Sequence, residues 1–281
     1  MLEIQIAESQ RQSGELSSAQ LTAAVAAIRE DGFVILLGAT ELAHVDALNA
    51  RMMADRAQLD AAGKTLLPLL RGNQAMPRDP EYLFADIVKN AFVAQILRAV
   101  MGGEAWCGMY ASNVSLPGCG EQELHVDQAP RQAEDPVGYP TNCMVVNTAL
   151  VDFTLENGAT EVWPGTHMVP CSIGSRYPDD NEQAARRVVA PPVRACMPRG
   201  ALLLRDIRLW HRGTANRTDI YRAMVAMIAH GGYLPAIKPR SALTSIGIMP
   251  NSARDFFATG PIYYNPEFTP DPIDLAAISQ K

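Results

Sequence analysis

Apolar and polar positions follow two different patterns along the chain, and the change falls after about the first hundred residues. Before it, apolar residues recur every three or four positions, the spacing of helices with one buried face. We expect helices to begin after Ser17 or Ser18, after Thr40 and after Asn90, because these side chains can accept backbone N–H groups of a first helical turn. A short buried strand, FVILLG, separates the first two. The pattern predicts a helical layer over residues 15–103.

Beyond this layer, short apolar runs alternate with Gly, Pro and Asn, which is typical of an antiparallel sandwich or barrel. The expected strands are CGMYASNVSL, NCMVVNTALVDF, ATEVWPG, PRGALLLRD, LWHRG and RAMVAMIAHGGY. The polar stretch 174–190 is expected at the surface with a short helix, and DPIDLAAISQ as a short final helix. The predicted fold is mainly β. A double-stranded β-helix, or jelly-roll, core over residues 104–235 is covered by the N-terminal helices and followed by an irregular tail, 236–281, in one domain, 1–281.

The composition of the chain argues against some classes of binding partner. The 281 residues are 48% hydrophobic, which is enough apolar material for a large core. The net charge of −6 and the absence of a basic run argue against nucleic acid or an anionic membrane surface as a partner. Neither a secretory signal nor an apolar run of membrane-spanning length is visible, so a cytoplasmic protein is expected. The five cysteines include no C-x-x-C pair and predict buried free thiols.

The segment EQELHVDQ places His125 and Asp127 two positions apart. On a strand, such residues point to the same side and can reach one ion. Non-haem iron sites use two imidazoles and one carboxylate on one face of an octahedron. The candidates for the second imidazole are His44, His167, His211 and His230. We favour His211, because it follows the apolar run ALLLRDIRLW and opens a Gly-containing turn at the expected mouth of the barrel.

Arg222 adds a second kind of chemistry. It lies eleven residues after His211, at the start of RAMVAMI. A dicarboxylate cosubstrate needs a cation to hold its far carboxylate, and Arg does this with two hydrogen bonds and stays charged when desolvated. Arg217 is a rival, but it lies in the polar turn ANRTD, where solvation is favoured. A zinc or manganese protein of the same fold would have no use for such a clamp.

Three segments together resemble the phytanoyl-CoA dioxygenase family of Fe(II)/2-oxoglutarate-dependent oxygenases: EQELHVDQ, ENGATEVWPGTH and LWHRGTANRTDIYRAMVAM. The N-terminal IREDGFVILLGA resembles the opening helix and strand of that family, so the resemblance covers roughly residues 15–235. The short chain, and the Gln three positions before the first ligand, are most similar to the branch that tailors fungal meroterpenoids and alkaloids.

The resemblance implies a role for each matching residue. The implied iron ligands, which form the catalytic centre, are His125, Asp127 and His211. Arg222 would pair with the C5 carboxylate of 2-oxoglutarate, and Thr160 would add a hydroxyl bond to it. Gln122 would bond the C1 carboxylate end near the metal. Gln122 and His125 would face oppositely on a regular strand, so a bend near Gly118–Gly120 is required for Gln122 to point inward.

The implied activity is oxidation of an unactivated C–H bond of a small secondary metabolite. The cofactor and cosubstrates would be Fe(II), 2-oxoglutarate and O2, with release of succinate and CO2. The outcome stays open between hydroxylation, desaturation, rearrangement and endoperoxide formation, whereas Asp127 argues against halogenation, because halogenating relatives carry Ala or Gly there. Tyr110, Met109 and residues 65–80 are candidate pocket linings. Relatives in the tailoring branch also imply a homodimer.

Two alternatives stand beside this interpretation. An acyl-CoA 2-hydroxylase would use the same chemistry but needs a basic patch for the CoA phosphates, and the chain has only four lysines: Lys64, Lys89, Lys238 and Lys281. A non-catalytic jelly-roll binding protein would give no charge-transfer absorption with Fe(II) and 2-oxoglutarate.

Overall fold

The computed structural model of the protein describes residues 1–63, 79–103, 105–128, 141–169, 175–231 and 262–263, together with residues 74, 76 and 77. The described strands are β1 (Glu3–Gln5), β2 (Phe33–Leu37), β3 (Ala105–Ser115), β4 (Cys143–Ala149), β5 (Glu161–Val162), β6 (Val193–Arg194), β7 (Leu202–Asp206), β8 (His211–Arg212), β9 (Arg222–Gly231) and β10 (Ile262–Tyr263). The described helices are α1 (Glu8–Ser13), α2 (Ser18–Glu30), α3 (Leu42–Ala61), α4 (Ala85–Val88), α5 (Ala91–Met101) and α6 (Asp180–Val189), with 3-10 turns η1 (Pro80–Tyr82) and η2 (Thr166–Met168).

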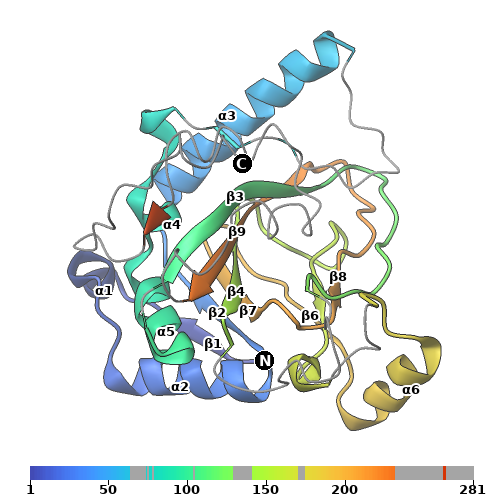
Figure 1. Cartoon of the computed structure of the whole chain (residues 1–281). Coiled ribbons are helices and arrows are strands. Elements are labelled where there is room, and N and C mark those ends of the chain that lie inside the picture. Colours follow the sequence, from blue (N-terminus) through green and yellow to red (C-terminus); the bar gives the residue numbers. More distant parts are fainter. Residues whose placement is uncertain are drawn as a thin grey trace, which may run out of the picture.

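The strands form two sheets that enclose the interior of a jelly roll. The large sheet has the order β1-β2-β7-β4-β9-β3-β10, and the small one has the order β6-β5-β8. One apolar cluster joins them, since it includes Leu203 and Met224 from the large sheet and Val162 from the small one. Figure 1 shows the helices α2, α4 and α5 on one side of the large sheet and β6 and β8 on the other. The predicted jelly-roll core covered by N-terminal helices is therefore confirmed.

The predicted helix starts are correct in two of three cases. Ser17 accepts a hydrogen bond from Gln20 N at the start of α2, and Asn90 accepts from the first N–H groups of α5. The prediction that Thr40 caps α3 is wrong. The helix begins after Glu41, and the Thr40 hydroxyl donates to Gly200 O at 2.8 Å. A buried carbonyl from a distant turn competes for this hydroxyl, and helical periodicity cannot reveal such a partner.

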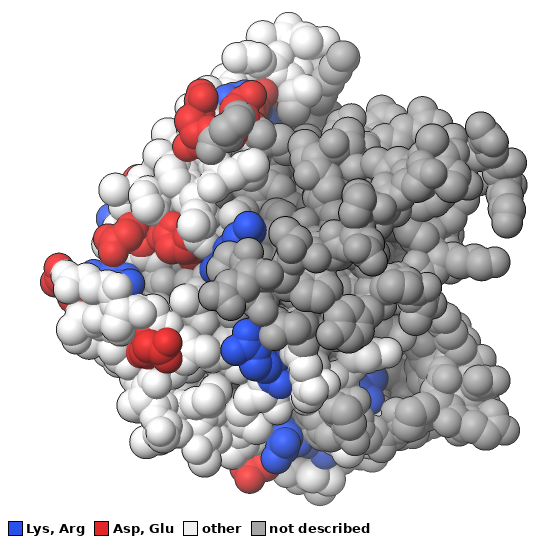
Figure 2. Space-filling view, turned by 60° about the vertical axis from the view of Figure 1, so that its left-hand side comes forward, with Lys and Arg blue, Asp and Glu red and all other residues white. Residues whose placement is uncertain are grey.

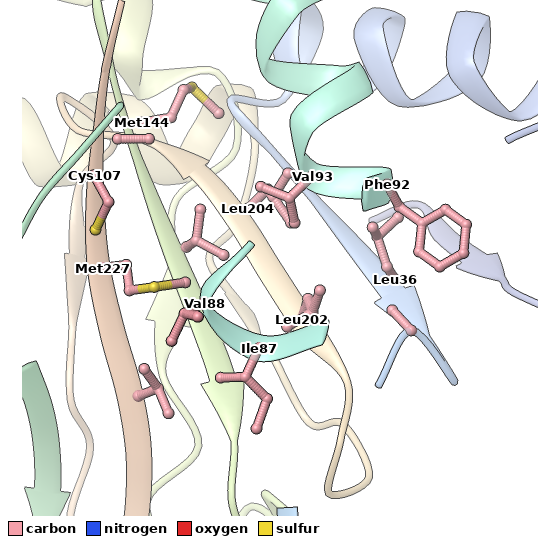
Figure 3. Packing of buried hydrophobic residues seen from close by; sticks show 14 of the residues in the cluster. Leu36, Ile87, Val88, Phe92, Val93, Cys107, Met144, Leu202, Leu204 and Met227 are labelled. Carbon is pink, nitrogen blue, oxygen red and sulfur yellow. The ribbon is translucent and has the colours of Figure 1, made fainter. Parts of the chain in front are cut away.

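Helices α4 and α5 close the outer face of the large sheet. Their apolar side chains pack against β2, β3, β4, β7 and β9 in the main core. Figure 3 shows Ile87 and Val88 of α4 and Val93 of α5 lying over Leu204 and Met227 of the sheet. Because these helices cover the outer face of the sheet, the site can form only on the opposite, inner face of the same strands.

A row of side chains crosses the inner face of the large sheet. Arg205 of β7 pairs with Val145 of β4, Val145 with Ile228 of β9, and Ile228 with Met109 of β3. Directly paired residues share a face. Met109 packs against the buried cluster that contains Val145 and Ile228. Tyr110 points the other way into the helix-covered core, so its predicted place in the pocket is wrong.

Every expected strand segment contains a strand, although β5 and β8 have only two residues each. Pro164 and Gly213 follow them closely, and these residue types end strands. The helix expected within 174–190 is α6. Within the predicted irregular tail, β10 pairs antiparallel with β3. The expected final helix in DPIDLAAISQ and most of residues 65–80 lie outside the described residues, and the division into one domain stays a prediction.

The described surface is mixed in charge. On the face shown in Figure 2, groups of acidic side chains lie among Lys and Arg side chains. Among the described helices, none has the length and apolarity to cross a membrane. The four described cysteines are free thiols, and three of them are buried: Cys107, Cys119 and Cys143.

Candidate metal and cosubstrate site

His125, Asp127 and His211 converge at one point in the fold. Each offers one ligand atom, and these atoms all lie within 4.8 Å of one another. The two histidines face each other across an isolated antiparallel bridge, in which His125 N donates to His211 O at 3.0 Å and His211 N to His125 O at 2.9 Å. This exchange brings residues 86 positions apart together and sets their rings 4.4 Å apart.

The local route to this geometry differs from the predicted one. His125 and Asp127 do not belong to a regular strand; only His125 forms a bridge, and Asp127 lies in a bend. Asp127 reaches the site because its own N–H donates to Ile207 O at 3.2 Å. Backbone bonds to the segment before His211 therefore replace the alternation of a strand. The expected turn near Gly118–Gly120 is present, with Gly118 at φ 74°.

Hydrogen bonds direct both imidazoles toward the centre of the site. Nδ1 of His125 lies 2.8 Å from Glu123 O, and Nδ1 of His211 lies 3.0 Å from Leu209 O. A carbonyl accepts, so each Nδ1 carries the proton and each Nε2 keeps its lone pair. These Nε2 atoms lie 3.9 Å (His125) and 3.6 Å (His211) from the Asp127 carboxylate oxygens. Two neutral imidazoles and a carboxylate, each oriented by a second group, suit a divalent metal ion.

Burial and neighbouring charges keep the two imidazoles neutral and the Asp127 carboxyl ionised, the states that bind a metal ion. Burial lowers the pKa of His211 well below its usual value, and the Arg205 cation lowers it further. Burial also lowers the pKa of His125, although Asp127 opposes the shift. For Asp127, burial alone would raise the pKa, but the charge of Arg205 and its hydrogen bond to the carboxylate outweigh burial and hold the pKa below its usual range. At neutral pH the site therefore presents unprotonated ligands.

Two arginines beside Asp127 were not anticipated from the sequence. Arg205 is 3% exposed, and its Nη2 donates to Asp127 Oδ2 at 2.6 Å. Arg176 lies on the outer side, with Nη2 3.7 Å from Asp127 Oδ1, and its Nε donates to Val126 O at 2.8 Å. The signal for Arg205 is present in PRGALLLRD, where a charged residue occupies an inward position in a buried strand. A buried charge needs a partner, and only the fold shows which one.

The turn WPGTH supports His211 rather than supplying a ligand. The Thr166 hydroxyl accepts from Trp210 N at 2.9 Å, and Trp163 N donates to Trp210 O at 3.0 Å. His167 instead bonds to Arg29 O, with Nε2 at 3.2 Å from that carbonyl oxygen.

The two remaining histidines lie away from the described triad. His44 pairs with Asp86 at 2.8 Å and stacks on Phe84. His230 stacks on Trp106, with ring centroids 4.7 Å apart.

Arg222 lies inside the barrel, where its guanidinium could bind a carboxylate. It is 2% exposed, and its guanidinium lies 4.6 Å above the Phe153 ring. On β9 it shares the inward face with Met224, which packs against Phe153 in the cluster between the sheets. The rival Arg217 is exposed in the loop that follows β8.

Thr160 and Gln122 take different positions near this region. Thr160 is 5% exposed, directly before β5. Gln122 is exposed, and its side-chain oxygen accepts from Gly213 N at 2.7 Å, while its own N–H donates to Gly213 O at 2.8 Å. With the oxygen engaged, the amide nitrogen of Gln122 is the group that would donate to a carboxylate.

The glycine of the ENGAT segment, Gly158, allows two loops to approach each other closely. Gly158 has φ 87°, and a Cβ there would lie 2.6 Å from Thr214 O. Asn157 shapes the same turn, since it accepts from Thr154 N and donates to Asp152 O at 2.7 Å. The motif thus brings the loop before β5 against the loop after β8.

Comparison with known proteins agrees with this geometry. The model of the phytanoyl-CoA dioxygenase family matches residues 28–224. The chain is 32% identical, over 72% of its length and 68% of the relative's, to the Fe(II)/2-oxoglutarate-dependent dioxygenase nvfF of Aspergillus novofumigatus. It is 28% identical, over 74% of its length and 72% of the relative's, to the dioxygenase aneA of Aspergillus aculeatus.

Solved structures share the fold. EctD from S. alaskensis, solved with 2-oxoglutarate and 5-hydroxyectoine, matches with a TM-score of 0.58 at 23% identity, over 77% of this chain and 76% of that one. The carbocyclase SnoK from nogalamycin biosynthesis matches with a TM-score of 0.60 at 18% identity, over 82% of this chain and 91% of that one.

A jelly roll that carries a His-Asp-His cluster and a buried arginine on its inner face defines a class of metal-dependent oxygenases. The chain belongs to the phytanoyl-CoA dioxygenase family. It is an Fe(II)- and 2-oxoglutarate-dependent dioxygenase.

Proposed function

We propose that the protein oxidises an unactivated C–H bond of a small secondary metabolite, with 2-oxoglutarate and O2 as cosubstrates and succinate and CO2 as coproducts. The observation that carries the proposal is the convergence of His125, Asp127 and His211, with both Nδ1 atoms bonded to backbone carbonyls. The names of the fungal relatives support the class of reaction.

Each residue has one task in this proposal. His125, Asp127 and His211 hold Fe(II) on one side and leave the opposite side for cosubstrate and O2. Arg222 receives the C5 carboxylate of 2-oxoglutarate. Its burial above Phe153 excludes water, which strengthens a charge-assisted pair.

Two polar side chains complete the proposed cosubstrate site. The Thr160 hydroxyl adds a donor near the C5 carboxylate, and the Gln122 amide nitrogen donates to the C1 carboxylate. Bound Fe(II), with 2-oxoglutarate and O2, supplies the oxidising power for C–H cleavage, and the protein contributes binding and orientation.

The inner face of β3 is the proposed wall for the substrate. Met109, Ala111 and Asn113 alternate with buried neighbours and are themselves only half-buried. Their partners on β9 are Ile228, Ala226 and Met224, so this part of the interior is mostly apolar. Such a surface suits a compact, largely hydrocarbon molecule. A homodimer and a cytoplasmic location stay predictions from the sequence.

The test is anaerobic addition of Fe(II) and 2-oxoglutarate to the purified protein. We expect a visible charge-transfer absorption, and succinate formation once O2 and a suitable substrate are added. His211→Ala should abolish both, whereas His230→Phe, which changes a half-buried histidine outside the triad, should keep both. If the unmodified protein gives neither signal, the non-catalytic alternative is correct.

A further inference from the structure

The feature that the proposed chemistry does not use is the buried Arg205. We infer that Arg205 is a positioning residue that holds Asp127 as a one-oxygen ligand, so that the metal keeps the positions needed by 2-oxoglutarate and O2. The inference rests on the proposed function, because it concerns the metal that the triad would hold.

Arg205 occupies a costly position. It is 3% exposed on β7, in the cross-strand row whose other members are Val145, Ile228 and Met109. A guanidinium among apolar side chains loses its hydration, and only a close anion offsets this loss. That anion is Asp127, whose Oδ2 lies 2.6 Å from Nη2. The ion pair therefore has a fixed partner and little freedom to reorient.

The contact treats the two oxygens of Asp127 differently. Oδ2 accepts the short hydrogen bond from Arg205 and lies 3.6 Å from His211 Nε2, whereas Oδ1 has no such bond to Arg205 and lies 3.9 Å from His125 Nε2. Adjacent ligand atoms on an octahedral ion lie about 3 Å apart at ordinary bond lengths of roughly 2.1 Å. A small inward shift of Oδ1 thus completes the triad without breaking the Arg205 bond. Nη1 of Arg205 also lies 3.5 Å from His211 Nδ1, but that nitrogen carries the proton directed at Leu209 O and cannot accept, so Arg205 acts on the ligands through Asp127.

A carboxylate without this restraint has a second way to bind. Carboxylates coordinate cations through one oxygen or through both. Binding through both would consume a further position on the metal, in competition with the chelating 2-oxoglutarate. Each oxygen of Asp127 lies within 4 Å of one histidine Nε2, so both are within reach of one ion, and Arg205 opposes this by holding Oδ2 in a short hydrogen bond.

Arg176 does not perform the same task. Its Nη2 lies 3.7 Å from Oδ1, beyond hydrogen-bond distance, and its side chain is 37% exposed. Its Nε and its backbone carbonyl both bond to Val126, at 2.8 and 2.9 Å. Arg176 therefore anchors the backbone between the two ligands, and the orientation of the carboxylate rests on Arg205.

The experiment compares Arg205→Met, Arg205→Lys and a matched control, Arg208→Met. Arg208 lies three positions away and pairs with a different buried carboxylate, Asp206, at 2.7 Å. The first measurement is calorimetric binding of 2-oxoglutarate to the Mn(II)-loaded proteins without O2. The second is a crystal structure of each Mn(II)-loaded protein, which counts the Asp127 oxygens on the metal.

We expect Arg205→Met to lower the 2-oxoglutarate affinity by about 10- to 100-fold, the range by which loss of a residue that orients metal ligands lowers metal affinity or activity. Both Asp127 oxygens should then contact Mn(II), whereas the unmodified protein shows one. Arg205→Lys keeps the charge but loses the forked donor, so its affinity should fall by a smaller factor, roughly three- to tenfold. Arg208→Met should bind as the unmodified protein does.

The outcomes separate the inference from the proposed function. If the unmodified Mn(II) protein binds no 2-oxoglutarate, the proposed function fails. If it binds normally and Arg205→Met binds equally well, with one Asp127 oxygen on the metal, the positioning role is overturned. Full recovery in Arg205→Lys would also overturn it, because charge alone would then explain the effect. Should Arg205→Met not fold, Arg205→Lys alone decides by the same criterion.

Discussion

Replacement of Arg222 by Met is the most direct test of the cosubstrate pocket. Met matches the length of the Arg stem and can still pack on Phe153, over which the guanidinium now lies at 4.6 Å. The substitution therefore removes the charged fork and preserves most of the packing. A carboxylate that enters the pocket would then meet no cation from β9.

The magnitude follows from the burial of the pair. Arg222 is 2% exposed, so solvent screening is slight. Loss of one partner from a buried, hydrogen-bonded charge pair costs about 2–5 kcal/mol. At about 1.4 kcal/mol per tenfold change, the apparent Kd for 2-oxoglutarate should rise by about 30-fold or more. Arg222→Lys keeps a point charge but loses the two parallel donors of Arg. Its apparent Kd for 2-oxoglutarate should therefore lie between those of the unmodified protein and Arg222→Met.

The assay is 2-oxoglutarate-dependent O2 consumption over a wide range of cosubstrate concentration. We expect KM for 2-oxoglutarate to rise strongly and kcat at saturation to fall less, because Arg222 binds the end of the cosubstrate remote from the metal. Arg217→Met is the matched control, since Arg217 is exposed in the neighbouring loop. Normal activity of Arg222→Met at limiting cosubstrate would refute the clamp.

Three further predictions concern stability. Asn90→Ala should lower the free energy of unfolding by about 1–2 kcal/mol, measured by urea denaturation, because Asn90 caps α5 and also donates to Ala39 O at 2.8 Å; an unchanged urea midpoint would contradict this. Gly32→Ala should cost about 2–4 kcal/mol, because Gly32 has φ 87° and a Cβ would lie 2.6 Å from His167 Nδ1; a loss below about 0.5 kcal/mol would show that the turn relaxes. Burial lowers the pKa of His230 to about 4, below its unfolded value of about 6.5, so the unfolded chain takes up the proton first and stability falls as pH drops from 6.5 to 4. His230→Phe should remove about one proton from this dependence in pH-resolved thermal unfolding, and an identical slope in both proteins would contradict the assignment.

Local patterns were sufficient for much of the fold. Ser17 and Asn90 cap helices as expected, because a cap depends on residues only two or three positions away. Thr40 shows the limit of this reasoning, since its hydroxyl bonds to a carbonyl 160 positions away. The strands were located by their apolar runs, but the register that aligns Arg205 with Val145, Ile228 and Met109 follows from pairing between distant segments.

For the candidate site, too, some features were evident from the sequence and others only from the tertiary structure. The sequence alone indicated the ligand types, the preferred histidine and the arginine on the following strand, because each belongs to a motif with a chemical reason for its spacing. The tertiary structure decided how Asp127 reaches the site from a bend, which tautomer each histidine adopts, and that Arg205 is the cation beside the carboxylate. Hydrogen bonds and burial between distant segments set these features, and a linear pattern carries no record of which distant atoms will meet.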